Sequence, residues 1–392
     1  MPSPTEASAA ADSRSPSLRR RKTGRILLAG TAALLLLGLF VRMVLFGGPF
    51  RTPVPLDGTP IVDIHTHAAG VGAGNSGCRV SPDLVASYKF SIYLKAFGTS
   101  RDELAVKGDD ILVDRIAERV KASRHVRKVV LLALDGPVDA SGNPDTNRTE
   151  VFVPNEFVAR GCRRHPEQLL FGASIHPLRQ DALARLDACA AQGAVLVKWI
   201  PSIMDFDPGD ERVVPFYRRM KELGMPLLTH TGQERSFTRA KDELCDPKRL
   251  RRPLEMGLTV IAAHIASTGA NGGQRDTERL REMMREFPNL FSEISSLTQA
   301  NKPGYLGEAL RHPEFENRLC YGSDYPLVNT ALVSPWLFPL QLTREQMSGL
   351  AALENPWDAD IALKQALGVP PDIFHRTATL LRRTPAVAEA GR

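Results

Sequence analysis

Eight short apolar segments, each of a length suited to one buried β-strand, recur along the chain with helical patterns between them. They are Ile61–Ile64, Lys128–Leu134, Leu169–Ser174, Val195–Ile200, Pro226–Thr229, Thr259–Ala263, Leu290–Ile294 and Arg318–Tyr321. Buried strands that alternate with helices are typical of a parallel sheet, and eight such units predict a closed (β/α)8 TIM barrel. An open, doubly wound sheet is the alternative architecture.

Helix signals lie in the segments between the predicted strands. Three are clear, namely Ala182–Gln192 before Gly193, Val213–Leu223 before Gly224, and Thr277–Phe287 with Asp276 as its N-cap. We expect the barrel domain to span residues 61–382 and a C-terminal tail to follow over residues 383–392.

The net charge of +6 is concentrated in the N-terminal region of the chain. Residues 1–51 contain eight basic and two acidic side chains, so the remaining residues carry no net charge. A domain that binds nucleic acid needs a basic surface to neutralise phosphates, and the predicted barrel has no such excess. We therefore expect no nucleic-acid partner.

An apolar segment of 21 residues, Ile26–Phe46, precedes the barrel and is interrupted only by Thr31 and Arg42. As a helix it would be about 31 Å long, which matches the hydrocarbon core of a bilayer. We expect a single transmembrane helix between a disordered basic segment, residues 1–25, and a linker, residues 47–60. A cleaved secretory signal and a buried core helix are the alternatives.

The charges that flank this segment predict the topology of the protein. Six basic residues precede it, whereas only Arg42 and Arg51 lie at or beyond its far end. Because basic flanks stay in the cytoplasm, we expect the barrel on the other side of the membrane, in the periplasm or outside the cell.

Five cysteines are spread along the chain without a C-x-x-C pair, and their odd number cannot pair completely. We therefore expect buried thiols and no disulfide framework.

The loop after the first strand contains the pattern G-x-G-x-x-G, from Gly72 to Gly77. A dinucleotide site needs this pattern to turn directly from strand into helix, but here it lies several residues after His67, and Ser81-Pro82 delays the next helix. We interpret the loop Gly70–Gly77 as a mobile cover over the active-site end of the barrel.

Reactive side chains end most of the predicted strands. On the first strand, Asp63, His65 and His67 alternate along the chain and should project to one side, so that the two imidazoles can bind one metal ion. Other reactive residues end the later strands: His176, Lys198, His230, His264, Glu293 and Asp324. Active sites of TIM barrels lie at the carboxyl ends of the strands, so these residues predict one catalytic site.

The ordered set of motifs resembles the amidohydrolase superfamily. The motifs are His-x-His on the first strand, Lys198 in Val-Leu-Val-Lys-Trp-Ile-Pro, His230 in Leu-Leu-Thr-His-Thr-Gly, His264 in Ala-Ala-His-Ile-Ala, and Asp324 in Tyr-Gly-Ser-Asp-Tyr-Pro. The chain is most similar to the amidohydrolase-related branch, which includes α-amino-β-carboxymuconate-semialdehyde decarboxylase. The resemblance covers residues 60–382 and does not include the N-terminal apolar segment.

The resemblance implies a divalent metal held by His65, His67, His230 and Asp324, most often zinc, with manganese and iron as alternatives. It also implies that Asp324 acts as both ligand and base, and that His264 hydrogen-bonds the substrate or the developing oxyanion. Glu293 is expected to orient a histidine ligand from behind. Asp63 is expected either to do the same or to close the barrel floor.

In such proteins, the chemical state of the lysine at the position of Lys198 determines whether one or two metal ions are bound. A carboxylated lysine at this position bridges two ions, whereas a free lysine holds a substrate anion. We favour one ion, with Lys198 and His264 facing the substrate. An ion pair with a nearby carboxylate is the purely structural alternative for this lysine.

Four residues near the strand ends are candidates for substrate binding: His176, Arg235, Arg239 and Tyr325. The predicted reaction is hydrolysis of an amide, lactone or ester bond in a small molecule by metal-activated water. A non-oxidative decarboxylase is the alternative, and a non-catalytic, membrane-tethered binding module is a third reading. The predicted partners are a small-molecule substrate and the membrane, and homo-oligomerisation is left open.

Overall fold

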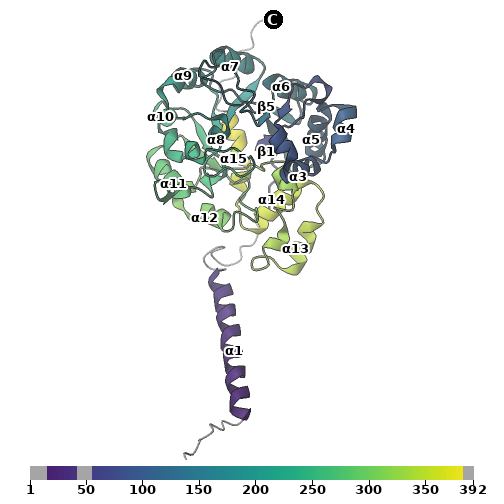
Figure 1. The fold of residues 1–392 in the computed structure, drawn as a ribbon, viewed down its shortest axis with the longest axis vertical. Coiled ribbons are helices and arrows are strands. Elements are labelled where there is room, and N and C mark those ends of the chain that lie inside the picture. The colour runs from purple at the N-terminus through teal and green to yellow at the C-terminus, as the bar shows by residue number, and fades with distance from the viewer. Residues whose placement is uncertain (1–15, 42–54, 383–392) are drawn as a thin grey trace, which may run out of the picture. The chain divides into compact units, whose positions relative to one another are not determined.

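The computed structural model describes residues 16–41 and 55–382 and separates the chain into two compact units, Met1–Gly48 and Pro49–Arg392. In the first unit, helix α1 runs over Pro16–Val41, and its part Gly24–Val41 is long and apolar enough to cross a membrane (Figure 1). The predicted tail, residues 383–392, lies outside the described residues.

Helix α1 begins ten residues before the expected start at Ile26. The prediction of disorder for residues 1–25 is therefore wrong from Pro16 onward. Leucine, arginine and lysine are good helix formers, and proline is well suited to a first helical position, so this basic segment can continue the apolar helix outward. The remaining parts of the predicted N-terminal segments, residues 1–15 and 42–54, lie outside the described residues.

In the second unit, eight parallel strands form one sheet in sequence order. They are β1 (Ile61–His67), β3 (Val126–Leu132), β5 (Leu169–Ala173), β6 (Ala194–Trp199), β7 (Leu227–Thr229), β8 (Val260–Ala262), β11 (Leu290–Glu293) and β12 (Leu319–Cys320). The last strand returns to the first, because Ile64 N–H donates to Tyr321 O at 3.2 Å and Asp324 N–H donates to His65 O at 2.9 Å. The predicted closed barrel is confirmed, and the open sheet is excluded.

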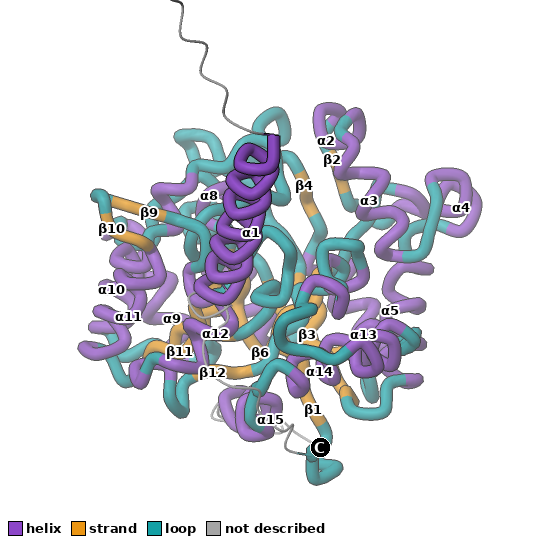
Figure 2. Tube along the Cα trace, turned by 90° about the horizontal axis from the view of Figure 1, so that it is seen from below, coloured by secondary structure: helices purple, strands orange, loops and turns teal. Residues whose placement is uncertain are grey.

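Helices surround the barrel; those up to α12 lie between successive strands, and α13, α14 and α15 follow the last strand (Figures 1 and 2). They are α2 (Pro82–Ala86), α3 (Tyr88–Phe97), α4 (Arg101–Lys107), α5 (Asp110–Ala122), α6 (Asn155–Arg164), α7 (Ala182–Ala191), α8 (Pro201–Met204), α9 (Val214–Glu222), α10 (Arg251–Glu255), α11 (Asp276–Glu286), α12 (Tyr305–Arg311), α13 (Arg344–Ala351), α14 (Pro356–Ala366) and α15 (Pro371–Arg382). Two short antiparallel pairs, β2 (Arg79–Val80) with β4 (Val151–Phe152) and β9 (Ala270–Asn271) with β10 (Gln274–Arg275), lie outside the barrel (Figure 2).

The three predicted helices are present as α7, α9 and α11, with one difference at a helix start. Asp276 is the first residue of α11, and the N-cap position belongs to Arg275. The Asp276 carboxylate accepts a hydrogen bond from Asn271 Nδ2 at 2.9 Å, so it is used by the preceding hairpin and not by the helix.

Two apolar clusters explain why the strands are almost wholly hydrophobic. One cluster fills the inside of the barrel with side chains such as Ile64, Leu196 and Ile261, and Leu380 of α15 is part of it. The larger cluster lies between the strands and the surrounding helices. Because both faces of each strand are buried, apolar residues are favoured at nearly every position, and a polar residue on a strand is conspicuous.

Helix α14 fixes the seam where β12 meets β1. Lys364 Nζ donates to Gly322 O at 3.1 Å and to Asp360 Oδ2 at 2.7 Å, and the Tyr321 hydroxyl donates to the same carboxylate at 2.9 Å. All three side chains are buried. The helix thus holds the end of the last strand, directly before the residues that enter the site.

The glycine-rich loop after β1 is tied down by one carboxylate. Asp109 Oδ2 accepts hydrogen bonds from Val71 N at 2.9 Å, Gly72 N at 2.8 Å and Ser76 Oγ at 2.5 Å. Gly70 and Val71 line a large cavity, so the loop lies beside it as expected, and its predicted mobility stays a prediction. The loop contains a single 3-10 turn, Ala73–Asn75, and no phosphate-binding helix, which agrees with the rejection of a dinucleotide site.

Candidate metal centre and active site

A cavity of about 760 Å³ opens at the carboxyl ends of the barrel strands. All six residues that the sequence predicts as metal ligands or catalytic groups line it: His65, His67, Lys198, His230, His264 and Asp324. The parallel strands end at the same side of the barrel, and the chain therefore brings residues from five different strands or strand ends together.

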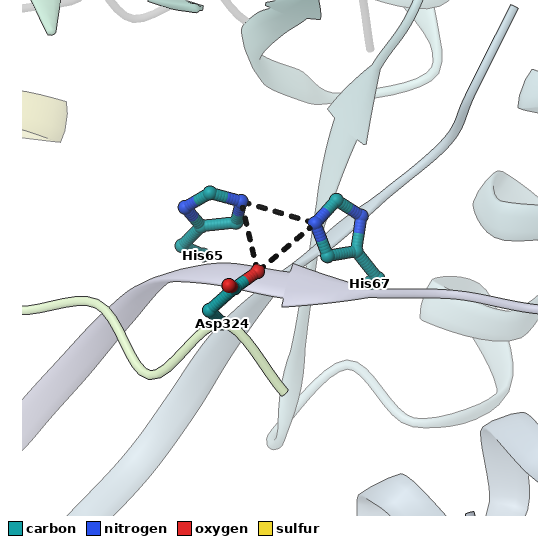
Figure 3. Close-up of side chains that lie close together, drawn as sticks. All are labelled: His65, His67 and Asp324. Atoms are coloured by element: carbon teal, nitrogen blue, oxygen red, sulfur yellow. Dashed lines mark hydrogen bonds and ion pairs between the residues drawn. The ribbon is translucent and has the colours of Figure 1, made fainter. Parts of the chain in front are cut away.

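Three potential ligand atoms converge in this cavity. His65 Nε2 and His67 Nε2 are 3.1 Å apart, and Asp324 Oδ1 lies 3.6 Å from the first and 3.3 Å from the second (Figure 3). Ligands placed about 2.0–2.1 Å from one tetrahedral ion are separated by roughly 3.3 Å, so the spacing fits a metal such as zinc. Two histidines from β1 and the carboxylate after β12 thus form a group that could hold a metal ion.

His230 lies in the same cavity but outside this tight group of three. Its Nδ1 is 3.3 Å from Glu234 Oε2, and its buried Nε2 has no partner among the described residues. The carboxylate fixes the proton on Nδ1 and leaves a lone pair on Nε2, which is the form that binds a metal. A buried imidazole nitrogen without a partner is therefore consistent with the predicted fourth ligand.

Glu293 at the end of β11 holds two of the histidines. Its Oε1 accepts from His65 Nδ1 at 3.1 Å and from the backbone N–H of His264 at 3.0 Å. Ser295 adds hydrogen bonds from Oγ to Oε1 at 2.8 Å and from its backbone N–H to Oε2 at 2.5 Å. Burial raises the pKa of Glu293, but these hydrogen bonds outweigh burial and keep the pKa below its usual range.

Lys198 is completely buried and points at the metal site. Its Nζ donates to His65 Nε2 at 3.0 Å, since the other nitrogen of that ring donates to Glu293. Burial lowers the pKa of Lys198 to about 8, although Asp324 and Glu293 act in the opposite direction. The structural alternative, a direct ion pair of Lys198 with a carboxylate, is not formed within the described part of the chain.

The electrostatics of the cavity favour neutral imidazoles beside an ionised carboxylate. Burial, with help from Lys198, lowers the pKa of His65 to about 4, and burial also holds the pKa of His264 well below its usual value. Burial alone would raise the pKa of Asp324, but the neighbouring histidines hold it well below the usual range. Ser296 Oγ donates to the second carboxylate oxygen, Oδ2.

Two of these residues have an unusual backbone. His264 and Asp324 both have φ near +60°, the left-handed region that side chains other than glycine seldom adopt. Such conformations persist where the surrounding structure enforces them, and they are concentrated at functional sites. Here they turn the chain sharply at the strand ends and direct both side chains into the cavity.

Of the four predicted substrate-binding residues, only Arg235 lines the cavity. Its guanidinium donates to Gln233 Oε1 from Nε at 3.0 Å and from Nη2 at 2.8 Å, so its partner is neutral. Arg239 instead forms an ion pair with Asp83 at the surface.

The other two predicted substrate residues, His176 and Tyr325, do not line the cavity. His176 is buried behind the cavity, where Nε2 donates to Met204 O at 3.0 Å and the ring packs against Phe206. Tyr325 is buried as well, stacks on Trp357 with ring centres 4.9 Å apart, and its hydroxyl meets Arg119. A position near a strand end thus does not guarantee that a polar side chain faces the cavity.

Asp63 supports the metal site without facing it. A register shift in β1 interrupts the expected alternation after Asp63, and its carboxylate accepts from Ser323 N at 3.0 Å and from Trp357 Nε1 at 2.7 Å. It also accepts from the backbone N–H of His65 at 2.9 Å. Asp63 therefore joins the strand that carries the histidines to the loop that carries Asp324.

The residues of the cavity and its supports that the sequence did not predict include Glu234, Ser295 and Lys302. Glu234 follows His230 by four positions, and an acidic residue close after a ligand histidine was an available signal. Ser295 and Lys302 follow the strand that ends in Glu293, but serine and lysine are common in loops and gave no distinct pattern.

Comparison with known proteins supports the resemblance. The model of the amidohydrolase family matches residues 62–351. No curated protein matches the sequence.

Several solved structures are similar to the chain. An uncharacterised TIM-barrel protein from Bordetella bronchiseptica has 18% identity and a TM-score of 0.49, with 83% of this chain and 99% of that one covered. A putative 2-pyrone-4,6-dicarboxylic acid hydrolase from Pseudomonas putida has 16% identity and a TM-score of 0.48, with 83% and 98% covered. A manganese-bound 5-carboxyvanillate decarboxylase from Novosphingobium aromaticivorans has 12% identity and a TM-score of 0.46, with 83% and 96% covered.

The family model spans most of the barrel, and within the barrel the predicted histidines and aspartate meet at one end of the strands. The chain therefore belongs to the amidohydrolase family of metal-dependent enzymes.

Proposed function

We propose that this protein is a metal-dependent hydrolase that uses activated water to cleave an amide, lactone or ester bond of a small molecule. The observation that supports the proposal most directly is the convergence of His65 Nε2, His67 Nε2 and Asp324 Oδ1 within 3.6 Å of one another. The nearby His230 Nε2, buried and without a partner in the described chain, would complete the ligand set.

A divalent ion held by these residues would supply Lewis acidity, which lowers the pKa of water and polarises a carbonyl oxygen. Three imidazoles and one carboxylate suit zinc well, and manganese and iron accept the same donors. Burial lowers the pKa of His65 and of His230 and so keeps both rings neutral, and the carboxylates of Glu293 and Glu234 fix the ring nitrogens that carry their protons.

Asp324 is the group that we assign as general base. Its carboxylate is ionised because interactions with the surrounding histidines hold its pKa well below the usual range, and its Oδ1 lies 3.6 Å from His65 Nε2 and 3.3 Å from His67 Nε2. A proton taken from the attacking water would reside on this carboxylate and then pass to the leaving group. The hydrogen bond from Ser296 Oγ holds the second oxygen and so fixes the plane of the carboxylate.

His264 is oriented to accept a hydrogen bond from the substrate or from water. The Ser295 hydroxyl donates to Glu293 Oε1 at 2.8 Å, so it accepts from His264 Nδ1 at 2.7 Å. This arrangement places the proton of the neutral ring on Nδ1 and the lone pair on Nε2. The ring can then receive a proton, whereas a developing oxyanion needs a different donor.

Lys198 is the donor that we assign to the oxyanion. Its ammonium occupies the lone pair of His65 Nε2 at 3.0 Å, and that lone pair cannot bind an ion and accept this hydrogen bond together. With an ion held by His65, Lys198 must turn to another acceptor, and a substrate oxygen in the same cavity is available to it.

The metal assignment is tested by measuring bound metal in purified full-length protein. We expect about one equivalent of zinc or a similar ion, and its loss in the His65→Ala/His67→Ala double variant. The His125→Ala/His312→Ala double variant is the matched control, since neither histidine lines the cavity. Full metal retention in the first variant would falsify the ligand assignment.

We propose one ion, with Lys198 as an unmodified amine; the support is the hydrogen bond of its Nζ to His65 Nε2 at 3.0 Å. The Lys198→Ala variant should then lose turnover and keep about one equivalent of metal. A wild-type content of two equivalents that drops in this variant, and returns when short carboxylic acids are added, would show a carboxylated, bridging lysine instead.

Metal-assisted decarboxylation is the second candidate function. The cavity contains Lys198, Arg235 and Lys302, and these cations could hold the carboxylate that is lost. A screen of small esters, lactones, amides and carboxylic acids with the metal-loaded enzyme separates the two reactions. Acid release supports hydrolysis, whereas carbon dioxide release without hydrolysis supports decarboxylation.

We also propose that α1 anchors the barrel outside the cytoplasm. The support is the apolar stretch Gly24–Val41 and the basic residues that precede it. The full chain should sediment with membranes, and a chain that starts at Pro49 should not. Protease added to intact cells or spheroplasts should degrade the barrel; complete protection would place it in the cytoplasm.

A further inference from the structure

Lys302 is a buried lysine in the cavity wall that the proposed mechanism does not use. It follows β11 in the loop that leads to α12, lines the cavity and is only 8% exposed. Its Nζ forms neither a hydrogen bond nor an ion pair with any residue in the described ranges. The side chain is largely buried, but its Nζ is not among the fully buried atoms without a partner, so the ammonium lies at the cavity surface, where an anion can pair with it.

A second cation lies at the same end of the cavity. Arg235 also lines the wall, although it is exposed to solvent, and among the described residues its guanidinium is bound only to the neutral amide oxygen of Gln233. Burial lowers the pKa of Lys302, and the positive charge of Arg235 lowers it further, although Asp324 and Glu234 oppose both. Two cations that repel each other and lack an ionic partner are an arrangement that an anion between them would stabilise.

The cavity wall as a whole has an excess of basic side chains, which also favours an anionic ligand. Its wall contains five basic side chains and two acidic ones. Both acidic groups are engaged, since Asp324 faces the ligand histidines, and Glu234 contacts His230 and accepts from Ser236 N at 2.6 Å. Neither therefore pairs directly with Lys302.

The rest of the wall is largely apolar. Helix α3 contributes Phe90, Tyr93 and Leu94, and the segment after β12 contributes Leu327 and Leu332. Beside Lys302, the Oδ1 atom of Asn301 is buried without a partner among the residues described, so one polar atom is also available to a ligand.

We propose that Lys302, with Arg235, forms a subsite for a carboxylate that does not take part in the reaction, so that the enzyme selects apolar acids. The carboxylate would bind the two cations while the apolar body of the molecule packs against α3, and the bond to be cleaved would lie at the ligand histidines. A single carboxylate matches the one free ammonium, because the guanidinium already shares its donors with Gln233. This inference rests on the proposed function only for the identity of the reacting bond.

The experiment measures binding and needs no turnover. Three probes of one shape, 3-phenylpropionate, 3-phenylpropionamide and 2-phenylethyl phosphate, are titrated calorimetrically into metal-free, full-length protein in detergent. We expect the acid to bind at least tenfold more tightly than the amide, since a hydrogen bond to an ionised partner contributes about a tenfold to hundredfold change. Lys302→Met should remove this preference, and Lys302→Arg should keep most of it.

Lys95→Met is the matched control, because Lys95 lines the same cavity but is exposed to solvent. It should bind the acid as the wild type does. Folding is followed by thermal unfolding without ligand, where Lys302→Met should unfold at the wild-type temperature or above, because an unpaired buried charge has been removed. A lower unfolding temperature would indicate a structural lysine and overturn the proposal.

Other outcomes are equally decisive. Equal binding of acid and amide by the wild type, or unchanged acid binding in Lys302→Met, would refute the subsite. Preference for the phosphate ester would show that the class of anion is wrong. The His65→Ala/His67→Ala variant should still prefer the acid, so failure of the metal assignment and failure of this subsite give different results.

Discussion

Replacing Glu293 by glutamine tests how far a buried carboxylate behind the histidines controls metal affinity. The glutamate accepts four hydrogen bonds, from His65 Nδ1, from the backbone N–H of His264, and from Ser295 Oγ and N–H. Glutamine has nearly the same shape but only one accepting oxygen. If that oxygen takes the place of Oε1, the new amide group faces the backbone N–H of Ser295, and two donors oppose each other.

The expected loss of metal affinity follows from these contacts. A buried donor left without an acceptor costs about 1–3 kcal/mol. In addition, His65 loses the negative charge that makes its ring a better ligand, and substitutions behind a ligand usually weaken metal binding about tenfold to hundredfold. This range corresponds to about 1.4–2.7 kcal/mol, so the two estimates agree.

The assay is competition for zinc between the protein and a chelator of known affinity. Glu293→Gln should release its metal at about tenfold to hundredfold lower chelator concentration than the wild type. Glu308→Gln is the control: this glutamate is also buried and pairs with Arg275 at 2.7 Å, but it lies outside the cavity. Equal affinity in the wild type, the variant and the control would refute the idea that Glu293 tunes His65.

The remaining predictions concern packing, pH and redox state. An alanine Cβ at Gly322 would lie 2.7 Å from Glu293 Oε2, so Gly322→Ala should lower the free energy of unfolding by about 1–3 kcal/mol in urea titrations. Gly349→Ala, where the new atom meets nothing within 4 Å, should not lower the free energy of unfolding. An equal loss of stability in both variants would contradict the steric argument. The hydrogen bond from Arg115 lowers the pKa of Glu103 from 4.5 to about 2. The ionised Glu103 therefore stabilises the fold above pH 4.5, and this contribution is lost as the pH falls toward 2. The wild type should be more stable than Glu103→Gln above pH 4.5, and the difference should shrink at lower pH. A difference in unfolding midpoints that stays constant over this range would count against it. All five cysteines are free and buried, so a reducing agent should leave the thermal unfolding temperature unchanged, and a lowered temperature would reveal a disulfide.

Most of the fold was predictable because a barrel of this type requires a simple sequence pattern, in which apolar strands alternate with more polar helices. A strand buried on both faces must be apolar along its length, so all eight strands stand out between polar helices. For the same reason His65, His67, Lys198 and His230 could be recognised, since a polar residue at the end of such a strand has few structural uses. Their convergence then follows from barrel geometry alone.

The parts that could not be predicted depend on how loops turn after the strands. Tyr325 directly follows a metal ligand but turns into the core against Trp357, whereas Lys302 lies nine residues after Glu293 and returns to the cavity. The direction of such side chains is set by contacts with helices distant in sequence. A local pattern of residue types does not contain that information.

The metal ligands come from the first strand of the barrel and from the turn after its last strand. Asp63 and Ser323, which join these two segments, are 260 positions apart in the chain. The centre therefore cannot exist in any incomplete chain, because a ribosome must finish nearly the whole barrel before the aspartate can meet the histidines. A bound ion would link the first strand to the turn after the last strand. It would therefore stabilise only molecules in which the two ends of the barrel have joined. Metal uptake by a refolding chain should consequently report the last step of assembly, the docking of β12 onto β1.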